Sequence, residues 1–193
     1  MFILYAVVIG VLVGLLAGGR PGGLASLRLR WQGAIVGGLL FQVVLFAGPV
    51  TERIGDLGPP LYVASTLVVV AAMVRNRAVT GIPVVIAGAL CNLVAVLANG
   101  GFMPASPTAL AAAGRVVPAA YSNSSQVANP AAWPLTDIFA LPAWLPLANV
   151  FSVGDVLIGA GVAIVIVVHM RRPVVADGGA LEPAAPAGGA PAH

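Results

Sequence analysis

The chain has 193 residues, of which 60% are hydrophobic and only 8% charged, and its mean hydropathy is +1.03. A soluble globular domain carries about 25% charged residues, so this composition excludes an ordinary water-soluble domain and predicts an integral membrane protein. The net charge of +3 comes from nine arginines, with no lysine, against six acidic residues. These arginines lie singly or in pairs beside apolar runs, a pattern that gives no support to nucleic-acid binding.

Apolar segments recur along the chain, each long enough, or nearly so, to cross a hydrocarbon core of about 30 Å as a helix. We therefore expect an all-α fold: a polytopic membrane helix bundle in one membrane domain, residues 1–172. The last residues, 173–193, are rich in alanine, proline and glycine and bury nothing, which predicts a disordered cytoplasmic tail. The five expected spans are residues 2–18, 34–48, 61–74, 81–98 and 153–170.

Glycines recur every four residues in the first span, at Gly10, Gly14 and Gly18. Such spacing puts small residues on one helix face and lets another helix approach closely. We favour packing inside the monomer; the alternative is a partner membrane helix. The following Leu27–Trp31 stretch combines leucine, arginine and tryptophan, which is typical of the lipid headgroup level. Membrane lipids are thus the expected partners.

Residues 99–149 form the expected extracytoplasmic cap loop. Ser106, Pro107 and Gly114 are typical of the N-cap, the first position and the C′ position of a short helix. The later part of the loop is apolar but interrupted by prolines every few residues. No regular transmembrane helix fits there, so we expect a re-entrant or membrane-surface segment.

The arginines also predict the orientation. With the amino terminus outside and five crossings, two arginines, Arg53 and Arg115, lie outside. The cytoplasmic segments then hold the other seven, as the positive-inside rule requires. We therefore predict a multi-pass protein of a bacterial inner membrane with a cytoplasmic carboxyl terminus. The seven predicted cytoplasmic arginines are Arg20, Arg28, Arg30, Arg75, Arg77, Arg171 and Arg172.

Asp155 stands at the start of the last span, where a carboxylate is costly unless a local partner satisfies it. The Ser152-x-x-Asp155 spacing predicts a capping box, in which each side chain bonds the other residue's backbone N–H. The alternative is a functional carboxylate near the outer face. We favour the cap, although a cap at a cavity mouth can also touch a ligand.

Other polar residues complete the candidate cluster. Arg115 and Asp137 share the loop and are predicted to pair. Gln42 and Asn92 lie inside spans, where we favour interhelical hydrogen bonding over a translocation path. The full candidate cluster, functional or structural, is Asn99, Arg115, Asp137, Asn149, Ser152 and Asp155, with Gln42 and Asn92 as the intramembrane polar residues.

No catalytic set stands out in the sequence. Cys91 is the only cysteine, which excludes an intrachain disulfide and a cysteine metal cluster. His169 lies beside Arg171 and is a lone histidine, which makes no metal site. No glycine-rich phosphate loop occurs in the right context. We expect no catalytic residue, metal, cofactor or nucleotide.

Three stretches together resemble the DUF5317 family of uncharacterised bacterial membrane proteins. They are Gly18-Gly19-Arg20 with Leu27–Trp31, then Asn99-Gly100-Gly101-Phe102-Met103-Pro104 with Ser106, and finally Asn149–Ile158. Asp137 with Leu141-Pro142 is similar to a further family segment, but Thr136 stands where glycine is expected. The resemblance covers about residues 1–172. It implies a multi-pass membrane fold and no known activity, substrate or cofactor.

Two functional hypotheses remain open. The favoured one is a non-catalytic membrane component, either an accessory subunit or a binder of lipid or another apolar ligand. The alternative is a small membrane enzyme or transporter whose site, under the cap loop, uses Asp155 and Asp137. A transporter would need charged or broken helices at the midplane, where only Gln42 and Asn92 lie.

Overall fold

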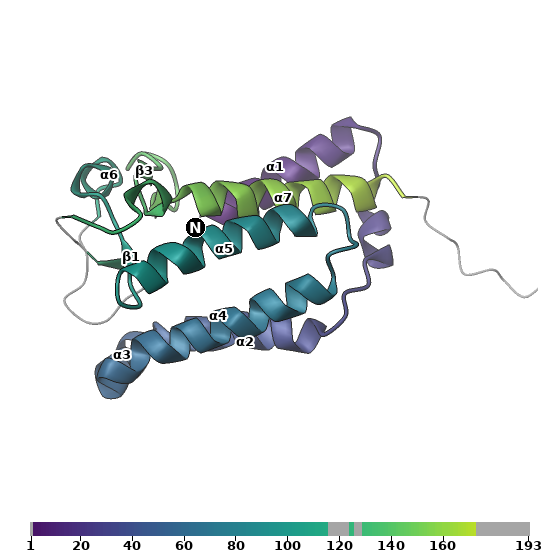
Figure 1. Ribbon diagram of the computed structural model, residues 1–193. Coiled ribbons are helices and arrows are strands. Elements are labelled where there is room, and N and C mark those ends of the chain that lie inside the picture. Colours follow the sequence, from purple (N-terminus) through teal and green to yellow (C-terminus); the bar gives the residue numbers. More distant parts are fainter. Residues whose placement is uncertain (1, 116–123, 126–128, 173–193) are drawn as a thin grey trace, which may run out of the picture.

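The computed structural model describes residues 2–115, 124–125 and 129–172, and most of them are helical (Figure 1). The predicted all-α class is confirmed at this level. The predicted tail, residues 173–193, lies outside the described residues, as do parts of the cap loop. The helices are α1 (Phe2–Leu16), α2 (Gln32–Leu45), α3 (Gly48–Ile54), α4 (Gly58–Arg75), α5 (Ile82–Ala98), α6 (Pro107–Ala112) and α7 (Val153–Met170), with 3-10 turns η1 (Pro21–Ser26), η2 (Gly55–Leu57) and η3 (Trp133–Leu135).

Residues 49–60 correct one sequence-based expectation. The spans predicted at 34–48 and 61–74 leave these residues as a short connecting loop, but α3, η2 and the start of α4 make them helical. Prolines occupy first-turn positions here: Pro49 is the second residue of α3, and Pro59 and Pro60 lie in the first turn of α4. A missing N–H costs little at the first turn, because those donors have no intrahelical partner.

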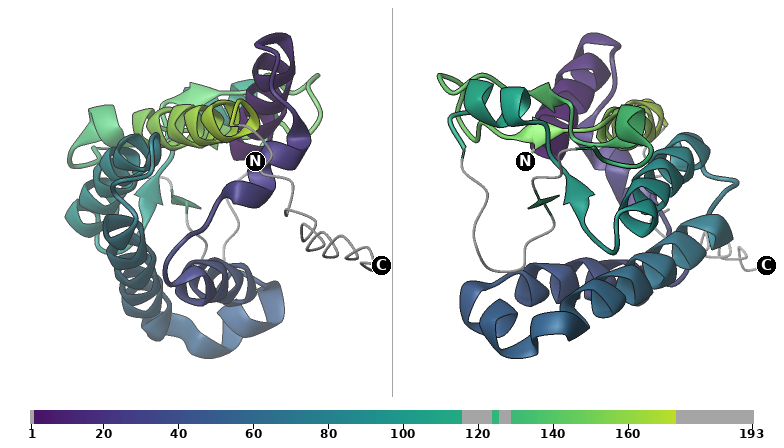
Figure 2. Two further views of the ribbon diagram at one scale, coloured as in Figure 1. Left: turned by 90° about the vertical axis from the view of Figure 1, so that its right-hand side faces the viewer. Right: turned by 60° about the vertical axis from the view of Figure 1, so that its left-hand side comes forward.

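The helices form two groups (Figures 1 and 2). In one group α7 packs between α1 and α5, and in the other α2 runs along α4, with α4 also contacting α5. Glycines allow the close approach of the first group. A Cβ at Gly10 would meet Ala163 of α7 at 2.9 Å, and one at Gly14 would meet the Met170 sulfur at 2.6 Å. Both glycines thus serve packing within the chain, whereas Gly18 has nothing within 4 Å.

Two helical stretches of the described chain are long and apolar enough to cross a membrane, Gly48–Arg75 and Val153–Met170. The helices α1, α2 and α5 are apolar but shorter. At 1.5 Å per residue the 15-residue α1 spans about 22 Å, less than a full hydrocarbon core. Length and composition alone therefore identify two candidate spans where the sequence predicted about five.

The cap gathers at one end of the helices, with α6 and two small strand pairs (Figure 1). The strand pairs were not predicted. β1 (Met103–Pro104) pairs in parallel with β2 (Ser124–Ser125), and β3 (Phe139–Ala140) pairs antiparallel with β4 (Val150–Phe151). A small apolar core of Ala105, Ala109, Leu110, Ala113 and Val150 holds α6 to β4.

The amino-terminal end of α1 docks on this cap. The Phe2 ring stacks on Phe151 of β4, with ring centroids 4.5 Å apart. Phe139 of β3 also stacks on Phe151, with ring centroids 5.5 Å apart. The Tyr5 hydroxyl also donates to the Pro146 carbonyl. These contacts fix the amino terminus at the cap end and so send the carboxyl end of α1 to the opposite end.

Candidate functional site

The predicted capping box is present at the start of α7. The Asp155 backbone N–H donates to the Ser152 hydroxyl at 3.0 Å, and the Ser152 N–H donates to the Asp155 carboxylate at 3.1 Å. Ser152 is 0% exposed. The bonds satisfy backbone donors that a helix start otherwise leaves without partners, and they place a negative charge at the positive end of the helix.

Asn92 of α5 completes this arrangement. Its amide nitrogen donates to the Asp155 carboxylate at 2.9 Å, and its amide oxygen accepts from the Ser152 hydroxyl at 2.8 Å. Asn92, Ser152 and Asp155 therefore form a closed hydrogen-bonded set, the helix-end triad. The Asn92 amide thus joins α5 to the capping box that starts α7, in agreement with the predicted interhelical hydrogen bonding.

Close backbone packing positions the triad. A Cβ at Gly154 would overlap the Asn92 side-chain oxygen, and it would lie 2.7 Å from the Gly88 carbonyl oxygen. Only glycine at position 154 lets α7 come this near to α5. The pattern continues along the pair, because a Cβ at Gly161 would lie 2.7 Å from the Val85 nitrogen. Small residues at helix contacts are typical of membrane bundles.

Asp137 lies on the cap, apart from the triad in sequence. It is 6% exposed; its N–H donates to the Pro104 carbonyl and its carbonyl accepts from the Ser106 N–H, both at 2.9 Å. Asp137 thus joins two segments of the cap loop through its backbone.

The other predicted loop residues tie the cap together. The Asn99 amide donates to the Ala131 carbonyl and accepts from the Ala131 N–H, both at 2.9 Å. The Arg115 Nε donates to the Ala148 carbonyl at 3.1 Å, and its predicted pairing with Asp137 stays a prediction. The Asn149 carbonyl accepts from the Leu141 N–H at 2.8 Å. All three contacts hold loop backbone in place.

Gln42 lies away from the cap cluster, in the second helix group. Its amide nitrogen lies 3.2 Å from the hydroxyls of both Ser65 and Thr66 on α4. Each hydroxyl also donates to the Tyr62 carbonyl of its own helix. The contact therefore joins α2 to α4, in agreement with the interhelical interpretation.

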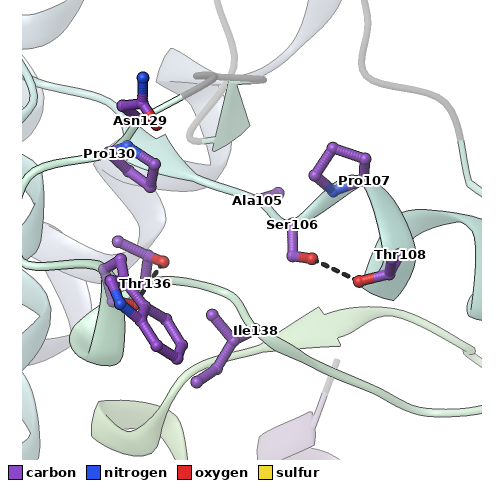
Figure 3. Close-up of a pocket in the computed structure, with 9 residues that line it drawn as sticks. Ala105, Ser106, Pro107, Thr108, Asn129, Pro130, Thr136 and Ile138 are labelled. Atoms are coloured by element: carbon purple, nitrogen blue, oxygen red, sulfur yellow. Dashed lines mark hydrogen bonds between the residues drawn. The ribbon is translucent and has the colours of Figure 1, made fainter.

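A cavity of about 690 Å³ opens in the cap, and we call it the cap pocket (Figure 3). None of the described residues that line it is charged. The apolar walls combine with hydroxyls and one amide, and the Ser106 and Thr108 hydroxyls lie 2.7 Å apart. Ser106 occupies the N-cap position of α6 as predicted, but its hydroxyl makes no cap bond. The lining residues are Ala105, Ser106, Pro107, Thr108, Asn129, Pro130, Trp133, Thr136 and Ile138.

Sequence reasoning did not find this pocket. It found the helix signature at Ser106 but gave no role to Asn129, Trp133 or Thr136, which lie more than 20 residues further along. The pocket arises because the parallel bridge between Ala105 and Asp137 brings the two loop segments together. In the sequence, only the polar pair Ser106 and Thr108 and the neighbouring Trp133 and Pro134 hint at a binding surface.

The chemistry of these groups is limited. In the described ranges, no three His, Cys, Asp or Glu side chains come together to hold a metal ion. Asp155 already accepts two hydrogen bonds inside the triad. The cap pocket offers neutral donors and acceptors beside apolar walls, an arrangement that suits binding an uncharged molecule.

The comparisons with known proteins give one match. No curated protein and no solved structure matches this chain. The sequence model of the "Family of unknown function (DUF5317)" matches residues 26–167. This range includes the cap loop, the helix-end triad and the pocket residues. Because the match covers well over half of the 193 residues, the chain belongs to the DUF5317 family, as its motifs predicted.

Proposed function

We propose that the chain is a multi-pass membrane protein with five crossings, and that it acts as a non-catalytic component binding lipid or another apolar ligand at its cap. The proposed membrane location rests on which side chains face outward and which face other helices. Large apolar residues are exposed along α1, α2, α4, α5 and α7, whereas Gln42 and Asn92 turn inward to polar partners. Lipid favours this arrangement, and water disfavours it.

The three shorter helices fit the same proposal. The first, α1, contacts α7 along its length, and α2 lies along the longer α4. Apolar residues such as Leu16, which is 89% exposed, stand at the very end of α1. A span shorter than the hydrocarbon core can be accommodated by local thinning of the bilayer and by snorkelling of flanking arginines.

The distribution of charge supports the orientation. The Arg20 N–H donates to the Met170 carbonyl, which brings the first basic segment to the carboxyl end of α7. Asn76 bonds the backbone of Arg30, which brings the same segment beside Arg75 and Arg77 at the end of α4. The described acidic residues lie toward the opposite end, before α4, in the cap and at the start of α7. By the positive-inside rule, this division of charge supports a cap on the outside and a basic end in the cytoplasm.

The uncharged cap pocket supports a binding role. Its walls include Trp133, Pro130 and Ile138. A ligand with an apolar body and one or two neutral polar groups would meet both kinds of wall. Gln42 and Asn92 bond polar groups of neighbouring helices, which supports a role in helix contacts.

The test combines extraction with occupancy. The protein should stay in membranes washed with alkaline carbonate and should leave them only with detergent. Ile138→Trp should fill the pocket and lower the amount of apolar ligand that co-purifies, read by native mass spectrometry. Val68→Trp, on the exposed face of α4, is the size-matched control and should keep wild-type occupancy. Equal occupancy in both variants would contradict the binding role.

A second candidate function is an enzyme or transporter that uses Asp137 of the cap and Asp155 at the start of α7 as its two carboxylates. In that case Asp137→Asn should abolish an activity while leaving the melting temperature unchanged. If the aspartates only hold the cap, the same change should lower the melting temperature instead.

A further inference from the structure

Two basic segments that are far apart in the sequence are locked together at the end opposite the cap. Asn76, which is 4% exposed, accepts from the Arg30 N–H at 2.7 Å and donates to the Arg30 carbonyl at 2.8 Å. Its amide nitrogen also lies 2.7 Å from the Ala72 carbonyl of its own helix. Both backbone groups of Arg30 are therefore bound to the end of α4. This fixes the linker before α2 beside the turn between α4 and α5.

These bonds bring four arginines to the same end of the molecule, and we call the four the arginine shelf. Arg28 and Arg30 come from the linker, Arg75 ends α4 and Arg77 follows it in the turn, and all four are exposed. In the described part of the chain, the carboxylates lie toward the cap end, so none is at hand to neutralise the shelf. Guanidinium groups bind phosphate oxygens through paired N–H donors. A phosphate group is the anion that this surface fits.

Trp31 extends the shelf toward an apolar surface. Its backbone is left-handed, with φ at 57°, and its side chain is 61% exposed. That conformation is unfavourable for a residue other than glycine, and it is held here next to the locked Arg30. The helix that follows, α2, exposes large apolar side chains along its length. They are Val36, Leu39, Leu40, Phe41, Val43 and Val44.

We propose that the arginine shelf binds the phosphate headgroup of an anionic phospholipid, whose acyl chains lie along the exposed face of α2. This inference rests on the proposed membrane placement. The indole of Trp31 marks the headgroup level, with the arginines above it and the apolar side chains below it. A soluble phosphate compound would use the arginines alone, whereas a phospholipid uses the whole surface.

The experiment uses the full chain purified in a neutral detergent, with lipid added back. Phosphatidylglycerol should raise the melting temperature more than phosphatidylcholine does. The fourfold variant R28Q/R30Q/R75Q/R77Q should lose that difference and need about tenfold or more phosphatidylglycerol for half the shift. The control R53Q/R115Q removes two arginines from the opposite end, as many as the twofold variant R28Q/R77Q does from the shelf, and it should keep the wild-type difference between the two lipids.

Further measurements distinguish a phospholipid from a soluble phosphate compound. Trp31→Ala should weaken the phosphatidylglycerol effect while inorganic phosphate alone gives none. An equal shift from inorganic phosphate, equal shifts from the two lipids in wild type, or a full lipid difference in the fourfold variant would each overturn the proposal. If the fourfold variant melts far below wild type in phosphatidylcholine, R28Q/R77Q is measured instead and should lose about half the difference. Extraction by carbonate without detergent would refute the membrane placement separately.

Discussion

At the scale of single residues, Gly154 and Asn92 decide how closely α5 and α7 meet. The Asn92 amide fills the space that a side chain at position 154 would need, and it spends both its donor and its acceptor on α7. The glycine and the triad therefore depend on each other. Neither helix alone contains this information, because the partners are 60 or more residues apart.

Gly154→Ala tests this dependence. The added methyl group must displace the Asn92 amide or push the helices apart, and such overpacking typically costs about 1–3 kcal/mol. We expect a fall of several degrees in the melting temperature in detergent. Gly37→Ala on α2, where nothing lies within 4 Å of the added Cβ, is the matched control and should leave the melting temperature unchanged or slightly higher. Equal melting of both variants would show that the close contact does not matter.

Asp155→Asn and Ser152→Ala test whether the triad is structural. The asparagine presents an NH₂ group to one of two donors, the Asn92 amide or the Ser152 N–H. The alanine strands the Asp155 N–H and the Asn92 oxygen. Each change leaves a group without a partner and should cost about 1–3 kcal/mol. We expect similar losses in melting temperature; a large loss for Asp155→Asn beside a mild one for Ser152→Ala would indicate a functional carboxylate.

At the scale of elements, the sequence predicted a helix well where start and stop signals mark both of its ends. The predicted bounds of α7, residues 153–170, match the structure, because Ser152 and Asp155 start the helix and Arg171-Arg172-Pro173 follows its end. Gly114 adopts φ of +63°, as its predicted place after α6 requires. The helical character of 49–60 was missed because prolines look the same in a loop and in a first turn. The strand pairs and the cap pocket were missed because they depend on contacts between distant loop segments.

Asn99 shows how a single side chain holds an element of the cap. Its amide bonds both backbone groups of Ala131 and so imitates a neighbouring strand. Asn99→Ala should free the segment that carries η3, since each lost bond contributes about 0.5–1.5 kcal/mol. Hydrogen exchange at Ala131 and Leu135 should become faster, with α7 unchanged. Asn129→Ala, at an exposed pocket position, is the control; protection that persists in Asn99→Ala would contradict the role.

At the scale of the whole molecule, the charges are divided between the two ends. Seven arginines lie in segments that meet at one end, while Arg53 and the described acidic residues lie toward the other. In water such a division has no evident advantage, because a surface of one sign repels itself. Across a bilayer it sets the orientation, since arginine-rich segments stay in the cytoplasm. The arginine shelf and the cap would then face opposite sides of the membrane.

Labelling of single cysteines tests this orientation directly. Cys91 is the only cysteine, so Cys91→Ala gives a background without thiols. Ala111→Cys places an exposed thiol on α6 of the cap, and Ala78→Cys places one in the turn beside the arginine shelf. A membrane-impermeant maleimide should label Ala111→Cys in intact cells and label Ala78→Cys only after the membrane is opened. Substituting Arg75 and Arg77 by glutamine should weaken the bias and give a fraction of chains in which Ala78→Cys is labelled from outside. Labelling of Ala78→Cys in intact cells with all arginines present would reverse the proposed topology, and with it the leaflet in which the shelf meets its lipid.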